Sequence, residues 1–145
     1  MLEMLGNQYF MARNYALACE TLEKALKEDP ENKPIRRKLI ICNTQIGNME
    51  RSLDLFISLV KEDADFIINT DPIDDDCPCA DLLYNFERKL HNNLSSTDYH
   101  IMLGILWLYC NTERSIHFFE AAREMDPENS KLRSVLSLLS TKKEN

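Results

Sequence analysis

The sequence predicts an all-α protein built from antiparallel pairs of helices. Apolar residues recur at helical spacing along most of the 145 residues, which is the pattern of helices that bury one face. Small residues stand where two such helices would touch, and prolines fall between the helices, because proline interrupts a helix interior. The composition, with 44% hydrophobic residues, 3 glycines and 5 prolines, excludes a disordered chain.

The clearest pair of helices lies at the start of the chain. Its pattern consists of Leu5, Gly6, Tyr9, Tyr15, Ala18, Leu22, Ala25 and Pro30. The glycine lets the first helix be approached closely, the two alanines do the same for the second, and Tyr9 and Leu22 fill the space between. Pro30 ends the second helix, because it lacks an N–H and disfavours helix at the residue before it. We expect the first helix to end near Ala12 and the second to span Tyr15 to Glu28.

These residues resemble the tetratricopeptide repeat, a helix pair of about 34 residues. The resemblance implies a TPR-like right-handed superhelix of helix pairs in a single domain, residues 1–145, and a scaffold that binds another protein. The predicted order along the chain is a repeat at 1–32, a repeat at 33–66, an irregular segment at 67–96, a repeat at 97–129 and a capping helix at 130–141.

The second and third copies match the pattern less fully. In the second, Gly47 stands at the turn position, but Ile40 replaces the usual glycine of the first helix. In the third, Gly104 and Trp107 match the first helix. The matching residues of its second helix are Ser115, Phe119, Ala122 and Pro127. The spacing between these two helices is one residue shorter than in the family, so we expect a tight turn at Asn111–Thr112.

The remaining segments depart from the repeat. Residues 70–79 carry two prolines and four aspartates, which no helix interior tolerates. A helix resumes near Ala80 and should fray near Asn92–Asn93. Each helix pair reverses the chain, so residues 63–70 must supply a second traverse, as a short helix, a continued helix or an extended return. We expect an irregular inserted hairpin here. The capping helix covers the end of the stack with Leu132, Val135, Leu136 and Leu139.

In the repeat family the first helices of the pairs line a concave groove, so the resemblance implies that binding residues lie there. The candidate groove residues are Asn7, Phe10, Met11, Arg37, Ile41, Thr44, Gln45, Ile101, Ile105, Leu108 and Tyr109. As a set they suit a peptide with large apolar side chains. The alternative for each apolar residue is a place in the core. The family's grip on a C-terminal carboxylate is disfavoured, because Glu3, Asp98 and Met102 replace the basic residues it needs.

Charge and hydropathy restrict the partners. A net charge of -7 argues against nucleic acid, which requires a clustered basic face. The acidity either keeps the chain in solution or attracts a basic peptide. The first residues lack the features of a signal peptide, and no apolar run reaches the roughly 20 residues that cross a bilayer. We therefore expect a cytoplasmic protein that does not contact a membrane.

The five cysteines are an odd number scattered along the chain, which indicates reduced thiols in the cytoplasm. The three expected in the core are Cys19, Cys42 and Cys110. The other two, in the sequence Cys77-Pro78-Cys79, could hold zinc together with His91 or His100. The signal is weak, because structural zinc sites use a different cysteine spacing and a second pair is absent. The alternative is an exposed acidic loop whose cysteines are incidental.

Nothing in the sequence supports catalysis, since the three histidines stand on different predicted helices and no glycine-rich loop could cradle a phosphate. We expect a non-catalytic adaptor or chaperone-like scaffold, without cofactor or metal, that holds a segment of a partner protein in the groove. The alternative is a metal- or redox-responsive regulator that uses Cys77 and Cys79. A further possibility is self-association, in which the first helix buries Leu2 and Leu5 against a second copy.

Overall fold

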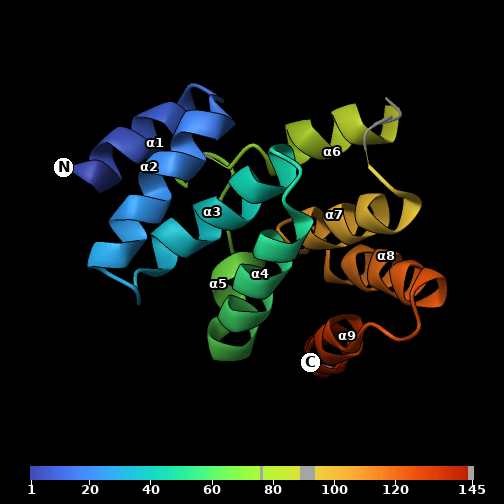
Figure 1. Cartoon of the computed structure of the whole chain (residues 1–145). Coiled ribbons are helices and arrows are strands. Elements are labelled where there is room, and N and C mark those ends of the chain that lie inside the picture. The colour runs from blue at the N-terminus through green and yellow to red at the C-terminus, as the bar shows by residue number, and fades with distance from the viewer. Residues whose placement is uncertain (76, 89–93, 144–145) are drawn as a thin grey trace. The chain divides into compact units, whose positions relative to one another are not determined.

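The computed structural model describes residues 1–75, 77–88 and 94–143. Within these ranges the chain forms helices joined by turns and contains no strand (Figure 1). The helices are α1 (Leu2–Met11), α2 (Tyr15–Glu28), α3 (Lys33–Gln45), α4 (Met49–Asp63), α5 (Asp65–Ile68), α6 (Cys79–Arg88), α7 (Ser96–Leu108), α8 (Thr112–Met125) and α9 (Ser130–Lys143). The predicted all-α class is confirmed. No helix in the described ranges combines the length and the apolar composition that crossing a bilayer requires.

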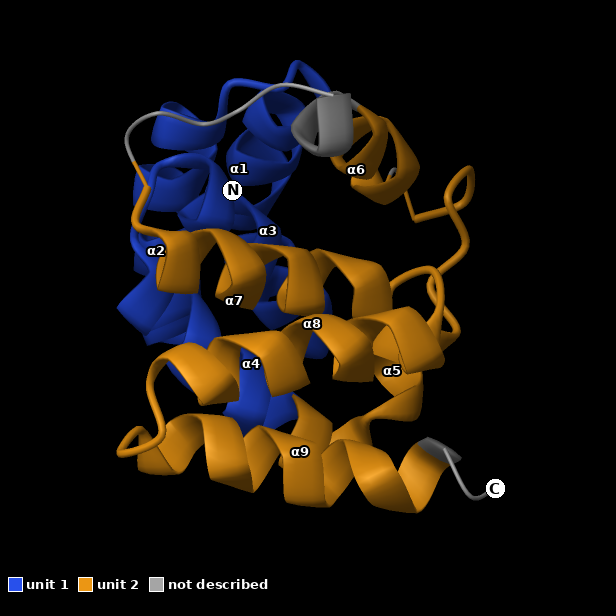
Figure 2. Cartoon of the chain, turned by 90° about the vertical axis from the view of Figure 1, so that its right-hand side faces the viewer, with its two compact units in different colours: residues 1–59 blue, residues 60–145 orange. Residues whose placement is uncertain are grey.

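The chain divides into two compact units, residues 1–59 and residues 60–145 (Figure 2). Unit 1 holds α1, α2, α3 and most of α4, while unit 2 holds the end of α4 and the helices from α5 to α9. The first predicted repeat lies in unit 1, and the third repeat and the capping helix lie in unit 2. The single domain and the superhelical path of the whole chain stay predictions.

In unit 1, α1 packs along α2, and α2 packs along α3. Gly6 is buried on α1, and a Cβ atom at this position would lie 2.5 Å from the Cδ2 atom of Leu22 on α2. Ala18 and Leu22 are both 0% exposed. The two helices therefore approach each other more closely than a side chain at Gly6 would allow, as the sequence predicts.

A buried serine joins the two helices of each later pair. In unit 1, Ser52 on α4 is 0% exposed, and its hydroxyl donates a 2.8 Å hydrogen bond to the carbonyl oxygen of Ile40 on α3. In unit 2, Ser115 on α8 donates in the same way to the carbonyl oxygen of Gly104 on α7. Both acceptors stand at the glycine position of the repeat. The bond therefore recurs even where isoleucine has replaced glycine, which the sequence reasoning missed.

Asparagine caps the second helix of each pair. The side-chain oxygens of Asn14, Asn48 and Asn111 accept hydrogen bonds of 3.2, 3.2 and 3.0 Å from the backbone N–H three residues later. In the first two pairs the residue before the asparagine has a positive φ, 63° at Arg13 and 85° at Gly47. Glycine adopts this conformation without steric cost, whereas arginine does so at a cost.

In unit 2, α7, α8 and α9 lie side by side in that order (Figure 2). A Cβ atom at Gly104 on α7 would lie 2.8 to 2.9 Å from three ring atoms of Phe119 on α8, a side chain that is 0% exposed. The apolar residues of α9 named above are all buried. Because α9 packs against α8, these residues cover the far side of the α7–α8 pair.

The segment between the second and third predicted repeats contains a short helix and a loop. Of the three paths expected for residues 63–70, the structure has the short helix, α5. Helix α6 begins at Cys79, one residue before the predicted start, and the predicted fraying at Asn92–Asn93 lies outside the described residues. The turn expected at Asn111–Thr112 is wrong for its second residue, because Asn111 caps α8 and Thr112 is already helical. The inserted hairpin stays a prediction.

Candidate functional site

Four of the candidate groove residues in unit 1 have accessible side chains. Asn7 and Met11 lie one turn apart on α1, and Met11 is 57% exposed. Arg37 and Gln45 lie two turns apart on α3, and both are partly exposed. Because α1 and α3 contact each other, unit 1 carries one apolar and three polar accessible side chains on two neighbouring first helices.

Asn7 differs from the other accessible residues in its hydrogen bonding. Its side-chain oxygen Oδ1 is buried and has no hydrogen-bond partner in the part of the chain that the structure describes. A buried acceptor without a donor costs about 1–3 kcal/mol. A ligand cannot reach this oxygen without displacing the atoms that cover it, so the missing hydrogen bond is a cost to folding and does not mark a ligand contact.

The other three candidates of unit 1 are buried: Phe10 is 1% exposed, and Ile41 and Thr44 are each 2% exposed. The ring of Phe10 meets the ring of Tyr15 edge to face, with 6.2 Å between centroids. The Thr44 hydroxyl donates a 2.6 Å hydrogen bond to the Ile41 carbonyl oxygen. The packing of these three residues corresponds to the core alternative rather than to an accessible groove.

The four candidates of unit 2 are also buried, between 0% and 4% exposed. They are Ile101, Ile105, Leu108 and Tyr109. Every residue from Ile101 to Leu106 is buried, so this part of α7 is enclosed on all sides. The sequence carried a signal for this, because residues 101–109 form an uninterrupted apolar run, and a helix that is apolar all round is a buried helix.

An ion pair that the sequence reasoning missed joins α2 to α4 in unit 1. The Nε and Nη2 atoms of Arg51 donate hydrogen bonds of 3.0 and 2.8 Å to the two carboxylate oxygens of Glu23. These hydrogen bonds raise the pKa of the Arg51 guanidinium. Both residues belong to the second helices of their pairs. The ion pair therefore links α2 to α4 and does not involve the candidate groove residues of α1 and α3.

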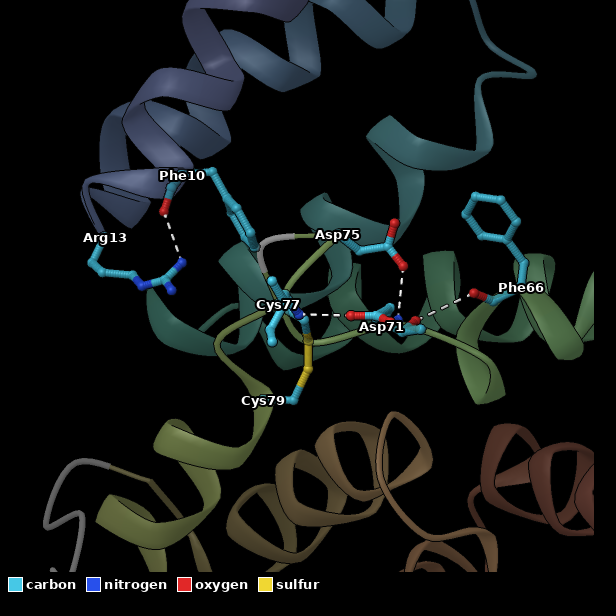
Figure 3. The surroundings of a disulfide bond; sticks show 9 residues. Phe10, Arg13, Phe66, Asp71, Asp75, Cys77 and Cys79 are labelled. Carbon is cyan, nitrogen blue, oxygen red and sulfur yellow. Dashed lines mark hydrogen bonds between the residues drawn. A yellow bond between two sulfur atoms is a disulfide. The ribbon is translucent and has the colours of Figure 1, made fainter.

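Cys77 and Cys79 form a disulfide at the start of α6 (Figure 3). The expectation of reduced thiols is therefore wrong for these two cysteines, and the zinc hypothesis loses its thiolate ligands. Of the two histidines in that hypothesis, His91 lies outside the described residues, and His100 Nδ1 lies 2.7 Å from the Ser96 carbonyl oxygen. The described residues contain no group of three or more His, Cys, Asp or Glu side chains that could hold a metal ion.

The remaining cysteines are free thiols. Cys19 and Cys42 are buried in unit 1, as expected, and burial raises the pKa of both thiols. The Cys19 thiol donates to the side-chain oxygen of Asn43 over 3.5 Å. Cys110 lies exposed in the turn after α7, so its expected place in the core is wrong.

Comparison with protein families gives a match to the tetratricopeptide repeat over residues 9–68. The matched range runs from Tyr9 on α1 to Ile68 at the end of α5, and so covers most of the first two predicted repeats. Comparison with curated proteins and with solved structures gave no match. Repeats of this family generally mediate protein–protein interactions. Residues 9–68 of this chain, with the helix pairs that they form, are therefore similar to the tetratricopeptide repeat family.

Proposed function

We propose that this protein is a non-catalytic scaffold, an adaptor or a chaperone-like protein, that binds a segment of another protein on the first helices of unit 1. The observation that carries the proposal is the family match over residues 9–68. Accessible side chains on α1 and α3, at positions that line the groove in this family, support it. The proposal includes no catalytic step, no cofactor and no resident metal.

The accessible residues favour a ligand segment with both apolar and polar groups. Met11 is exposed and flexible, so it can pack against a large apolar side chain of varied shape. Asn7, which is partly exposed, adds a polar side chain on α1, and Arg37 and Gln45 add polar anchors on α3. The buried candidates of unit 1 would support these contacts through packing rather than touch the ligand.

A capture experiment with matched variants tests the proposal. The variant Met11→Glu/Arg37→Glu changes two accessible residues of the first helices. The control, Leu17→Glu/Lys24→Glu, makes the same charge changes at exposed positions of α2. We expect a partner captured by the wild type to be lost from the first variant and kept by the control. Circular dichroism melting establishes that both variants fold, and equal capture by all three proteins would contradict the proposal.

We also propose that α1 can mediate self-association of the protein. Leu5 is 41% exposed and Met4 is 63% exposed, while Leu2 is partly exposed. Exposed apolar side chains on one helix can be buried against a second copy. Sedimentation over a range of concentrations separates the outcomes, because a mass that stays monomeric at high concentration removes this possibility.

We further propose a cytoplasmic location, with protein rather than nucleic acid or membrane as partner. The net charge of -7 supports a partner without a phosphate backbone. The three free cysteines support a reducing compartment, although the disulfide at Cys77 and Cys79 opposes it. Fractionation of cells that express the protein tests the location directly.

A further inference from the structure

The Cys77–Cys79 disulfide encloses a single residue, Pro78. A disulfide stabilises a fold mainly by restricting the unfolded chain, and this restriction grows with the length of the closed loop. A ring that spans one residue therefore restricts very little chain. The position of the disulfide is better explained by its chemistry than by stabilisation of unit 2.

The two sulfur atoms differ in how an incoming molecule can reach them. Cys77 is partly exposed in the loop before α6, whereas Cys79 is 3% exposed at the first residue of the helix. Thiol–disulfide exchange requires a thiolate to reach one sulfur atom along the axis of the bond. Attack on Cys77 is therefore open, and attack on Cys79 is blocked by the surrounding protein.

Hydrogen bonds that do not involve sulfur hold the loop around Cys77 (Figure 3). The carboxylate of Asp71 accepts from the backbone N–H groups of Ile73 and Asp74 over 2.8 and 3.0 Å. The Asp71 N–H donates to the Asp75 carboxylate over 2.8 Å, and the Cys77 N–H donates to the carbonyl oxygen of residue 72 over 3.1 Å. The loop thus keeps its anchors when the bond between the sulfur atoms opens.

We propose that Cys77 and Cys79 form a thiol–disulfide exchange site that is attacked at Cys77. A thiolate from the reductant forms a bond to the Cys77 sulfur, the bond between the two cysteines breaks, and its electron pair leaves on the Cys79 sulfur, which takes a proton from water. A second thiolate then attacks the reductant's sulfur in the mixed disulfide and releases the Cys77 thiolate. The disulfide gains two electrons, and the two reductant thiols become one disulfide. This site lies in unit 2 and does not depend on the proposed peptide binding.

The acidic residues around the loop select the kind of reductant. Asp71, Asp74 and Asp75 precede the disulfide and Asp81 follows it by two residues. The two N–H groups bound to the Asp71 carboxylate lower its pKa, so this residue stays ionised. Negative charges within a Debye length repel an anionic thiol and attract a cationic one. The reductant that fits is a thiol carrying positive charge, either a small aminothiol or a protein thiol within a basic surface.

Reduction kinetics with two small thiols test the charge selection. Cys110→Ser serves as the background, because Cys110 is the exposed free thiol of the described chain. The oxidised protein is mixed with cysteamine or with 3-mercaptopropionate, and the reaction is quenched with acid. The free thiols are then alkylated, and mass spectrometry measures the fraction of reduced protein. We expect the ratio of the cysteamine rate to the 3-mercaptopropionate rate, each taken per thiolate, to be about tenfold higher at low salt than at about 1 M salt, where the Debye length is about 3 Å.

A charge-neutral variant and two trapping variants complete the test. Asp74→Asn/Asp81→Asn should speed reduction by 3-mercaptopropionate and should not speed reduction by cysteamine. With cystamine as the disulfide, Cys79→Ser should form a mixed disulfide at Cys77 about tenfold faster than Cys77→Ser forms one at Cys79, since access controls the rate. Circular dichroism shows whether each variant is folded, and the wild-type kinetics do not depend on the variants.

Three results would overturn the proposal. If all five cysteines of the native protein alkylate without reductant after denaturation, no disulfide is present to exchange. If the two folded cysteine variants formed mixed disulfides at equal rates, the proposal that attack occurs at Cys77 would be wrong. If the ratio of the two rates per thiolate were the same at low and at high salt, the charge selection would be removed. If a protein thiol within a basic surface reduced the site faster than cysteamine does, the reductant would be a protein rather than a small aminothiol.

Discussion

Gly104→Ala tests the close packing of α7 on α8. The added methyl group would lie 2.8 to 2.9 Å from three atoms of the Phe119 ring, where ordinary contacts begin at 3.4 Å. The ring is fully buried, so it has no free space into which to move. Overpacking of this kind costs about 1–3 kcal/mol, and the better helix propensity of alanine returns up to about 1 kcal/mol.

The expected result is a decrease of up to about 2 kcal/mol in the free energy of unfolding, after the gain of about 1 kcal/mol is subtracted from the cost. Urea denaturation followed by circular dichroism measures it as a lower midpoint with an unchanged slope. Gly6→Ala is the comparison, because its methyl group would meet the Cγ and Cδ2 atoms of Leu22 rather than a ring. Leu22 is also 0% exposed, and its atoms would lie 2.5 and 2.7 Å from the added methyl group, so we expect a loss of similar size there.

A double-mutant cycle with Phe119→Leu assigns the loss to the ring. Phe119→Leu alone leaves a cavity and lowers the free energy of unfolding by about 1–3 kcal/mol. In the double variant, the loss of unfolding free energy should be smaller than the sum of the two single losses by about 0.5–2 kcal/mol. The methyl group of the alanine then occupies the space that the ring has left. If Gly104→Ala instead stabilised the protein by the ordinary preference of helices for alanine, the reasoning from close contact would be refuted.

Three further substitutions probe the turns and bonds of unit 1, and urea denaturation measures each. Ser52→Ala should lower the free energy of unfolding by about 1 kcal/mol, because it removes the buried hydrogen bond to Ile40; no change would mean that water replaces the hydroxyl. Gly47→Ala should cost about 1–2 kcal/mol, from the positive φ alone, since nothing lies within 4 Å of the added Cβ. Glu23→Gln should cost about 0.2–1 kcal/mol through the weakened pair with Arg51, and the cost should shrink at high salt.

The helices were largely predictable because their end signals are local. The second helix runs from Tyr15 to Glu28 as expected, since Asn14 can cap it and the chain meets proline two residues after its end. The close contacts at Gly6 and Gly104 were also predictable, because a glycine inside a helix pattern has few explanations other than packing. What could not be predicted was the hydroxyl bond from Ser52, whose acceptor lies 12 residues away on another helix.

The candidate groove was less predictable than the helices. Periodicity identifies the apolar side of a helix, but it does not say whether that side meets a ligand or another helix. Ile41 and Ile105 fit both readings in the sequence and are buried in the structure. The oxidation state of Cys77 and Cys79 was beyond the sequence, because spacing alone does not fix whether two thiols join. Cys110 was misplaced because it follows the last turn of α7, where the helix pattern ends.

The turns of the first two helix pairs have the same backbone path with different residues. Arg13 and Gly47 both adopt a left-handed conformation before an asparagine cap. The path is therefore imposed by the two helices that the turn joins, and the residue at the bend only adjusts its cost. For protein engineering, we expect the Gly47-Asn48 dipeptide to replace Arg13-Asn14 in the first pair at a lower conformational cost.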